Sequence, residues 1–114
     1  MRLIRSFKYA WNGLVVAIKE QPNLRIHFFV ATLVIALAVY FKVTKSEWLI
    51  LLLTMGWVIT LELINTSIEN LTNLVTKERS PLAGKVKDIA AAAVFFSTII
   101  AMVIGFILFL KYIF

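Results

Sequence analysis

The fold of this chain is decided by residues 48–69, which read WLILLLTMGWVITLELINTSIE. Residues 48–61 carry no charge. Residues 62–69, from Glu62 to Glu69, follow directly and contain no glycine or proline that would break a helix. At 100° per residue, Glu62, Asn65, Glu69 and Asn73 share an arc of about 80° on one helical face. Ionisable groups at membrane depth are costly and usually mark functional sites. We therefore predict a polar site on this face.

Composition indicates an integral membrane protein. The 114 residues are 61% hydrophobic, and their mean hydropathy is +0.92, so we predict a single membrane domain over residues 1–114. With no cysteine and one histidine, disulfides, thiolate metal sites and multi-histidine metal sites are excluded within one chain. The net charge of +6 is typical of anchoring to anionic lipid headgroups. No nucleic-acid motif is present, and we expect no nucleic-acid partner.

The hydrophobic pattern predicts an all-α fold with one surface helix and three transmembrane helices. Apolar residues recur every three to four positions within residues 1–21, which is typical of an amphipathic helix lying in the membrane interface. Pro22 is incompatible with continuing that helix. Ser46 is a candidate cap for the second membrane helix. We place the three membrane helices at about 24–43, 48–75 and 86–112.

The basic residues predict the orientation in the bilayer. Cytoplasmic loops carry an excess of Lys and Arg, and nine such residues fall on one predicted side against three on the other. We therefore expect a multi-pass protein whose N-terminus and second loop are cytoplasmic. The nine are Arg2, Arg5, Lys8, Lys19, Arg25, Lys77, Arg79, Lys85 and Lys87, and the three are Lys42, Lys45 and Lys111.

The polar residues near the cytoplasmic side suit phosphoryl transfer from ATP. This chemistry needs Mg²⁺, a cation along the phosphates and a base or orienting group at the acceptor hydroxyl. Mg²⁺ prefers oxygen ligands and keeps several waters, so Glu62 and Glu69 provide enough acidic positions. Lys87 adds a cation and Asp88 another carboxylate. No Walker A or glycine-rich kinase loop occurs, so we expect no soluble kinase fold.

Two motifs resemble those of the prokaryotic diacylglycerol kinase family: ELINTSIE at residues 62–69 and KDIAAAAV at residues 87–94. The match spans nearly the whole chain, and NLRIH at residues 23–27 looks most like the undecaprenol kinase branch. The resemblance implies a homotrimeric enzyme of the bacterial inner membrane. It implies transfer of the γ-phosphate of Mg·ATP to a membrane lipid alcohol, either undecaprenol or diacylglycerol.

The resemblance also implies residue roles. Glu62 matches the catalytic base, and Asn65 lies beside it at the acceptor; we also assign Arg25 to acceptor binding, with a positive-inside anchor as its alternative. Glu69 matches a metal ligand, and Gln21 stands where many relatives have a second metal-ligand glutamate. The positions that match nucleotide contacts are Arg2, Tyr9, Ala10, Glu69, Glu78, Arg79, Ser80, Lys87 and Asp88.

Two departures and several alternatives stay open at this stage. Gln21 and Asn73 are neutral where the family usually carries carboxylates, so we expect a weaker metal or nucleotide site. Glu62 could instead hydrogen-bond another helix, and Lys87 could be an ordinary interfacial lysine. We expect His27 to be an interfacial or packing residue without a chemical role. The alternative functions are a proton-coupled small exporter and a non-catalytic membrane subunit.

Overall fold

The computed structural model describes all 114 residues and contains four α-helices and no strand. Their bounds are α1, Arg2–Glu20; α2, Pro22–Phe41; α3, Lys45–Val75; and α4, Pro81–Ile113. Helices α2, α3 and α4 are each long and apolar enough to cross a membrane. The predicted fold class, a surface helix followed by three membrane helices, is confirmed. α3 and α4 begin earlier than the predicted starts at residues 48 and 86.

Local sequence explains where each helix begins and ends. The extended backbone of Gln21 separates α1 from α2, and Pro22 occupies the first turn of α2, where its missing N–H costs nothing. Lys42 ends α2 in the left-handed conformation, with φ of 53°. α3 is capped by Thr44, whose side chain accepts from the backbone N–H of Glu47, and not by Ser46 as the sequence had led us to expect. Thr44 is the cap because the Glu47 carboxylate accepts a hydrogen bond from the Thr44 backbone N–H, which completes a capping box.

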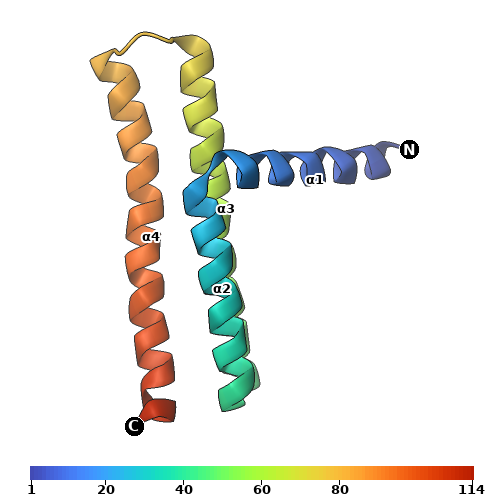
Figure 1. Cartoon of the computed structure of the whole chain (residues 1–114), viewed down its shortest axis with the longest axis vertical. Coiled ribbons are helices and arrows are strands. Elements are labelled where there is room, and N and C mark those ends of the chain that lie inside the picture. The colour runs from blue at the N-terminus through green and yellow to red at the C-terminus, as the bar shows by residue number, and fades with distance from the viewer.

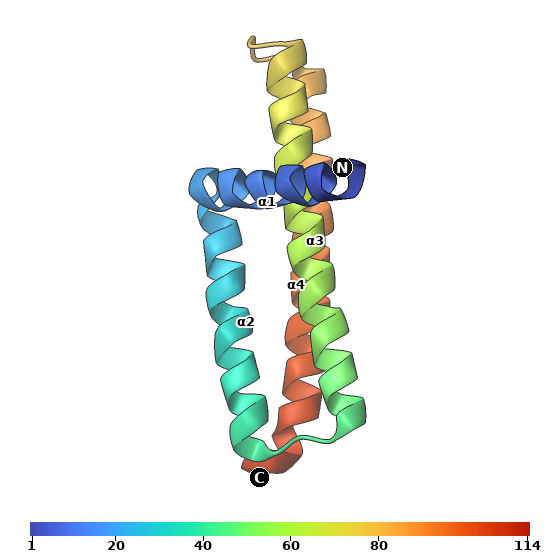
Figure 2. The same cartoon turned by 90° about the vertical axis from the view of Figure 1, so that its right-hand side faces the viewer.

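The four helices form an upright group of three with one helix lying across it. α1 runs roughly perpendicular to the others, and its N-terminus projects away from them (Figure 1). α2 stands beside α3 and α4, which both continue past the level of α1 to the loop that joins them (Figure 2). The α1–α2 turn therefore lies against the side of α3, well below the α3–α4 loop.

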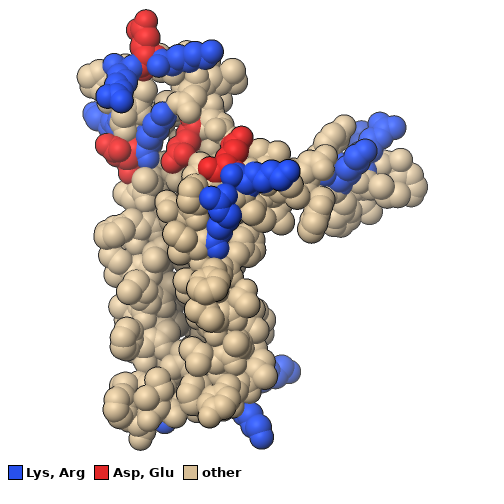
Figure 3. Space-filling view, in the orientation of Figure 1, with Lys and Arg blue, Asp and Glu red and all other residues tan.

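Charged side chains collect at the two ends of this arrangement. On the face shown in Figure 3, acidic and basic residues gather around α1 and the upper parts of α3 and α4, lysine or arginine appears again at the opposite end, and the region between is apolar. Only 15 of the 114 residues are buried within the chain. The apolar surface of α2, α3 and α4 is consequently free to contact lipid or other chains, as expected for a membrane protein.

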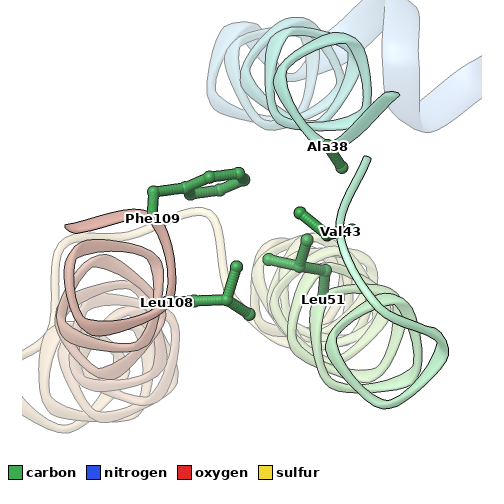
Figure 4. Close-up of a cluster of buried hydrophobic side chains, with 5 residues drawn as sticks. All are labelled: Ala38, Val43, Leu51, Leu108 and Phe109. Carbon is green, nitrogen blue, oxygen red and sulfur yellow. The ribbon is translucent and has the colours of Figure 1, made fainter. Parts of the chain in front are cut away.

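The largest buried apolar cluster lies at the end remote from α1. It consists of Ala38, Val43, Leu51, Leu108 and Phe109, which come from α2, the α2–α3 turn, α3 and α4 (Figure 4). A polar contact lies nearby: Glu47 binds Lys111 at 3.1 Å and accepts a hydrogen bond from the Tyr112 hydroxyl. These contacts hold the end of α4 against the start of α3 and so stabilise the packing at the end remote from α1.

Candidate active site

Glu62 is almost completely enclosed by the chain. Its residue is 1% exposed, although it lies in the middle of α3 among apolar neighbours. Its carboxylate Oε1 has no hydrogen-bond partner. The hydroxyl of Thr66 donates to the backbone carbonyl of Glu62, at 2.9 Å, and so does not serve the carboxylate. A buried, unpartnered carboxylate is costly, and such a group is a strong candidate for ligand binding or catalysis.

Glu62 lines a pocket of about 250 Å³ between α2, α3 and α4. Asn65, one turn along α3, contributes a second buried oxygen, Oδ1, that has no partner. Two unsatisfied acceptors at one small pocket suit a ligand that brings hydrogen-bond donors, such as a hydroxyl group. The lining residues are Asn23, Ile26 and His27 from α2, Glu62 and Asn65 from α3, and Ala91, Val94, Phe95 and Thr98 from α4.

Below this pocket an apolar groove of about 620 Å³ runs along the same three helices. It shares Ile26, His27 and Thr98 with the polar pocket and continues to Phe114 near the remote end. Of its 20 lining residues 16 are hydrophobic, so the groove suits a hydrocarbon chain rather than a polar ligand. A molecule with a hydroxyl head and an apolar tail matches the two spaces together.

Glu69 connects the α1–α2 turn to the polar face of α3. Its Oε2 accepts a hydrogen bond from the Gln21 side-chain amide at 3.1 Å, and its Oε1 accepts one from the Asn65 amide at 3.3 Å. The structure thus brings Gln21, Asn65 and Glu69 together in one hydrogen-bonded group. Glu62 is separate from this hydrogen-bonded group, because the amide nitrogen of Asn65 is turned toward Glu69.

The residues around Glu69 could bind Mg²⁺ only together with ligands from a bound nucleotide and water. No group of three or more His, Cys, Asp or Glu side chains could hold a metal ion by itself. Each Glu69 oxygen accepts a single hydrogen bond and retains a further lone pair. Since Mg²⁺ is commonly held by one or two carboxylates together with substrate phosphates and waters, Glu69 could hold the ion of a bound Mg–nucleotide complex.

Lys87 lies across from the outer part of α3. Its ammonium donates to Asn73 Oδ1 at 2.6 Å, which ties α4 to α3 above the pocket. Because Asn73 is neutral, this contact leaves the charge of Lys87 uncompensated and able to attract an anion. Asp88 follows Lys87 and is exposed. Asn73 therefore positions the Lys87 ammonium through a hydrogen bond but does not neutralise its charge.

The remaining predicted nucleotide contacts are not gathered around Glu69 within one chain. Arg2, Tyr9 and Ala10 are exposed on α1, which points away from the membrane helices (Figure 1). Glu78 and Arg79 lie in the exposed α3–α4 loop. Ser80 caps α4, since its hydroxyl accepts from the backbone N–H of Ala83 at 3.0 Å.

Arg25 has a structural partner outside the pocket. Its Nη1 donates to the carbonyls of Ile18 and Lys19, at 2.9 and 3.1 Å, and so satisfies backbone groups at the end of α1. Arg25 does not line the polar pocket. Its assignment to acceptor binding stays a prediction.

Sequence reasoning missed two polar pocket residues on α2. Asn23 and His27 line the pocket, although we had expected His27 to be a packing or interfacial residue and had given Asn23 no role. The two residues are four positions apart and so share one face of α2. That spacing of two polar residues at the start of a mostly apolar helix was a signal in the sequence.

A helical membrane protein with a buried carboxylate above an apolar groove has the features of an enzyme that acts on the head of a lipid. The comparisons identify the family: the profile of the prokaryotic diacylglycerol kinase family matches residues 8–109, so the chain belongs to this family. It is a lipid kinase, and ATP is the co-substrate that a kinase implies. The exporter and non-catalytic alternatives are not favoured.

Individual relatives agree with this assignment. The chain is 34% identical to undecaprenol kinase of Bacillus subtilis, over 96% of this chain and 89% of that protein. It is 35% identical to diacylglycerol kinase of Haemophilus influenzae, over 94% of this chain and 92% of that protein. Diacylglycerol kinase of Synechocystis is 38% identical over 90% of this chain, which spans 59% of the longer Synechocystis protein. Resemblance to the family, predicted from the motifs at residues 62–69 and 87–94, is confirmed.

Proposed function

We propose that this chain transfers the γ-phosphate of Mg–ATP to the hydroxyl of a membrane lipid alcohol, with Glu62 as the base. The observation that carries the proposal is the nearly complete burial of Glu62, whose Oε1 lacks a partner beside a pocket that opens into an apolar groove. A lipid hydroxyl in the pocket would supply the donor that Oε1 lacks. The lipid's apolar chain would lie along the groove.

Glu62 would act on the acceptor hydroxyl. The hydroxyl O–H bond breaks and its proton passes to Oε1 while the oxygen forms a bond to the γ-phosphorus, and the bond from that phosphorus to the ADP oxygen breaks. Positioned proton acceptors contribute ~10²–10⁴-fold to such steps. Asn65 Oδ1, the other unpartnered oxygen at the pocket, would help to orient the acceptor. Arg25 would lie at the rim, near the lipid headgroup.

Glu69 would hold the Mg²⁺ that accompanies the nucleotide, with Gln21 beside it. When bound, this ion neutralises charge on the β- and γ-phosphates. Lys87 would pair with phosphate oxygens, since Asn73 positions its ammonium without cancelling the charge. Asp88, together with Glu78, Arg79 and Ser80 near the α3–α4 loop, would border the nucleotide.

The complete site would form in a homotrimer, so that α1 of one chain can serve the nucleotide of another. Arg2, Tyr9 and Ala10 lie on α1, whose N-terminus projects away from α3 and α4 in the chain's own fold (Figure 1). The large exposed apolar surface of α2–α4 supports association in the bilayer. The number three comes from the family resemblance alone.

For the acceptor we favour undecaprenol over diacylglycerol. The chain is similar to the Bacillus subtilis undecaprenol kinase over most of both proteins, and residues 23–27 carry the stretch that resembles that branch. Both lipids offer a hydroxyl on an apolar body, so the pocket and groove alone do not separate them. The excess of basic residues at the end with α1 and the α3–α4 loop supports a cytoplasmic N-terminus in a bacterial inner membrane.

The test is direct phosphorylation of each lipid. Purified protein in mixed micelles receives radiolabelled ATP, Mg²⁺ and either undecaprenol or diacylglycerol, and the labelled lipid is separated and counted. We expect labelled lipid from the wild type, more with undecaprenol, and at least ~100-fold less from Glu62→Gln. Equal rates for wild type and Glu62→Gln would contradict the base assignment, and faster labelling of diacylglycerol would contradict the choice of acceptor.

A further inference from the structure

His27 is the one other titratable residue at the pocket that Glu62 lines. It projects from α2 opposite α3, and its Nε2 lies 3.8 Å from Glu62 Oε2. Its side chain is 18% exposed, so most of the ring is shielded from solvent. An imidazole N–H is a hydrogen-bond donor, and a carboxylate is only an acceptor, so the two groups are chemically complementary.

The two polar neighbours of Glu62 on α3 already donate elsewhere. The Thr66 hydroxyl binds the Glu62 backbone carbonyl, and the Asn65 amide nitrogen binds Glu69. An ionised carboxylate that is almost completely buried costs several kcal/mol unless a partner compensates it. His27 is the side chain that the structure places against the Glu62 carboxylate from another helix.

The separation of 3.8 Å exceeds the ~2.9 Å of an N–H···O bond by roughly 0.9 Å. Catalytic hydrogen bonds are often long without substrate and shorten when the substrate is bound. A small approach of α2 to α3, around a lipid in the groove that both helices line, would close this gap. The contact involves Oε2 and leaves Oε1 without any partner.

We propose that His27 is a positioning residue for the catalytic base. In the enzyme with substrate bound, its Nε2–H donates to Glu62 Oε2, which stabilises the ionised carboxylate and fixes its plane so that Oε1 receives the proton of the acceptor hydroxyl. This inference rests on the proposed role of Glu62 as the base. It gives α2 a part in the chemistry beyond lining the lipid groove.

The kinetic test compares His27→Leu, which removes the donor, with His27→Gln, whose side-chain amide keeps a donor near Nε2. We expect His27→Leu to lower kcat by at least ~10-fold while KM for ATP stays within about twofold, since the nucleotide residues are elsewhere. His27→Gln should be at least about threefold faster than His27→Leu. Phe29→Leu, at an exposed position on the same helix, is the matched control and should keep kcat within about twofold.

A spectroscopic test is independent of turnover, because His27 is the only histidine in the chain. Protein labelled with ¹⁵N-histidine therefore gives the imidazole signals of this one residue. At fixed pH and with the acceptor lipid present, we expect the Nε2 resonance to move in Glu62→Gln and to stay in place in Glu69→Gln, where a different carboxylate on the same helix is neutralised. An unmoved resonance in Glu62→Gln, or an unchanged kcat in His27→Leu, would overturn the inference.

The wild-type reaction separates this inference from the proposed function. If the wild type phosphorylates neither lipid, the proposed function fails. If the wild type is active, Glu62→Gln is inactive and His27→Leu equals the wild type, only the role of His27 fails. Circular dichroism and the oligomer distribution of each variant establish that losses of activity do not come from misfolding, and the resonance comparison needs no His27 variant.

Discussion

Replacing Gln21 by glutamate would test whether a metal ion binds between the α1–α2 turn and α3. In the wild type, the Gln21 amide donates to Glu69 Oε2 at 3.1 Å. In Gln21→Glu that donor becomes a second carboxylate at almost the same place. Two negative groups would then lie within reach of one cation, which is an arrangement that Mg²⁺ binds more tightly than a carboxylate paired with an amide.

The magnitude follows from what the substitution removes and adds. A hydrogen bond to a charged group contributes ~1.5–3 kcal/mol, and it is lost. Like charges about 4 Å apart repel by ~4 kcal/mol at an effective dielectric constant near 20, before the half-exposed side chains rotate apart into solvent. Rotation into solvent screens most of that repulsion, so we expect a net cost of ~2 kcal/mol without metal, close to the value of the lost hydrogen bond. A divalent ion that bridges the two carboxylates restores a similar amount, so its affinity should rise roughly 30-fold.

Two assays measure this effect. The first is lipid phosphorylation as a function of buffered free Mg²⁺, in which Gln21→Glu should reach half-maximal rate at a roughly 10- to 30-fold lower concentration. The second is thermal unfolding without nucleotide, in which Gln21→Glu should be less stable than the wild type in chelator and should regain the difference in Mg²⁺. The second assay does not depend on catalysis.

Asn70→Asp is the matched control. Asn70 donates to Glu20 Oε2 at 3.3 Å, so this change also creates two facing carboxylates between α3 and the end of α1. Both positions are exposed, and Asn70 lies about 100° around α3 from Glu69. Solvent screens such pairs, and the Mg²⁺ dependence should change by less than about threefold. If Gln21→Glu and Asn70→Asp behave alike in both assays, the metal does not bind beside Glu69 and the reasoning is refuted.

Three further predictions concern separate parts of the molecule. Lys87→Ala should raise KM for ATP by about tenfold or more, because a charge-assisted phosphate contact is lost, and an unchanged KM in steady-state kinetics would remove Lys87 from the nucleotide site. Glu62→Gln and Lys87→Ala proteins, each impaired alone, should regain partial activity when co-reconstituted if the two residues act across a subunit boundary; no recovery despite confirmed mixing would favour sites completed within one chain. Glu47→Ala should lower the free energy of unfolding by ~2 kcal/mol, because it breaks the capping box and the contact with Lys111. The kcat of the folded protein should stay within about twofold of the wild type, and equal melting curves for the two proteins would contradict the prediction.

The sequence was sufficient for those features that depend on periodicity along one helix. The shared face of Glu62, Asn65 and Glu69 follows from the helical repeat, and the polarity of that face in an apolar segment indicated a site. The cap of α3 was also readable, because Thr44 and Glu47 have the spacing of a capping box, which the prediction of Ser46 did not take into account. That error came from an overlooked local rule and not from tertiary structure.

The pairing of helices could not be read from the sequence in the same way. His27 meets Glu62 because α2 and α3 pack at one particular register, and a shift of one residue would rotate the imidazole by 100° away from that contact. The hydrogen bond between Gln21 and Glu69 likewise depends on where the α1–α2 turn touches α3. The family motif placed Gln21 and Glu69 at one site, but it gave no indication that the carboxylate accepts from the amide.

One chain builds the proposed acceptor side of the site more completely than the proposed nucleotide side. The polar pocket, the apolar groove and the Glu69 contacts all form within a single copy. Arg2 and Glu20, however, stand at opposite ends of a 19-residue helix, about 27 Å apart at 1.5 Å per residue. Only the C-terminal end of α1 reaches the α1–α2 turn. The positions on its outer half that resemble nucleotide contacts can therefore meet a phosphate near Lys87 in two ways. Either α1 moves over its own chain, or it reaches a neighbouring chain. Recovery of activity in mixed subunits would favour the neighbouring chain, and it would explain why an isolated chain leaves so charged a helix without a partner.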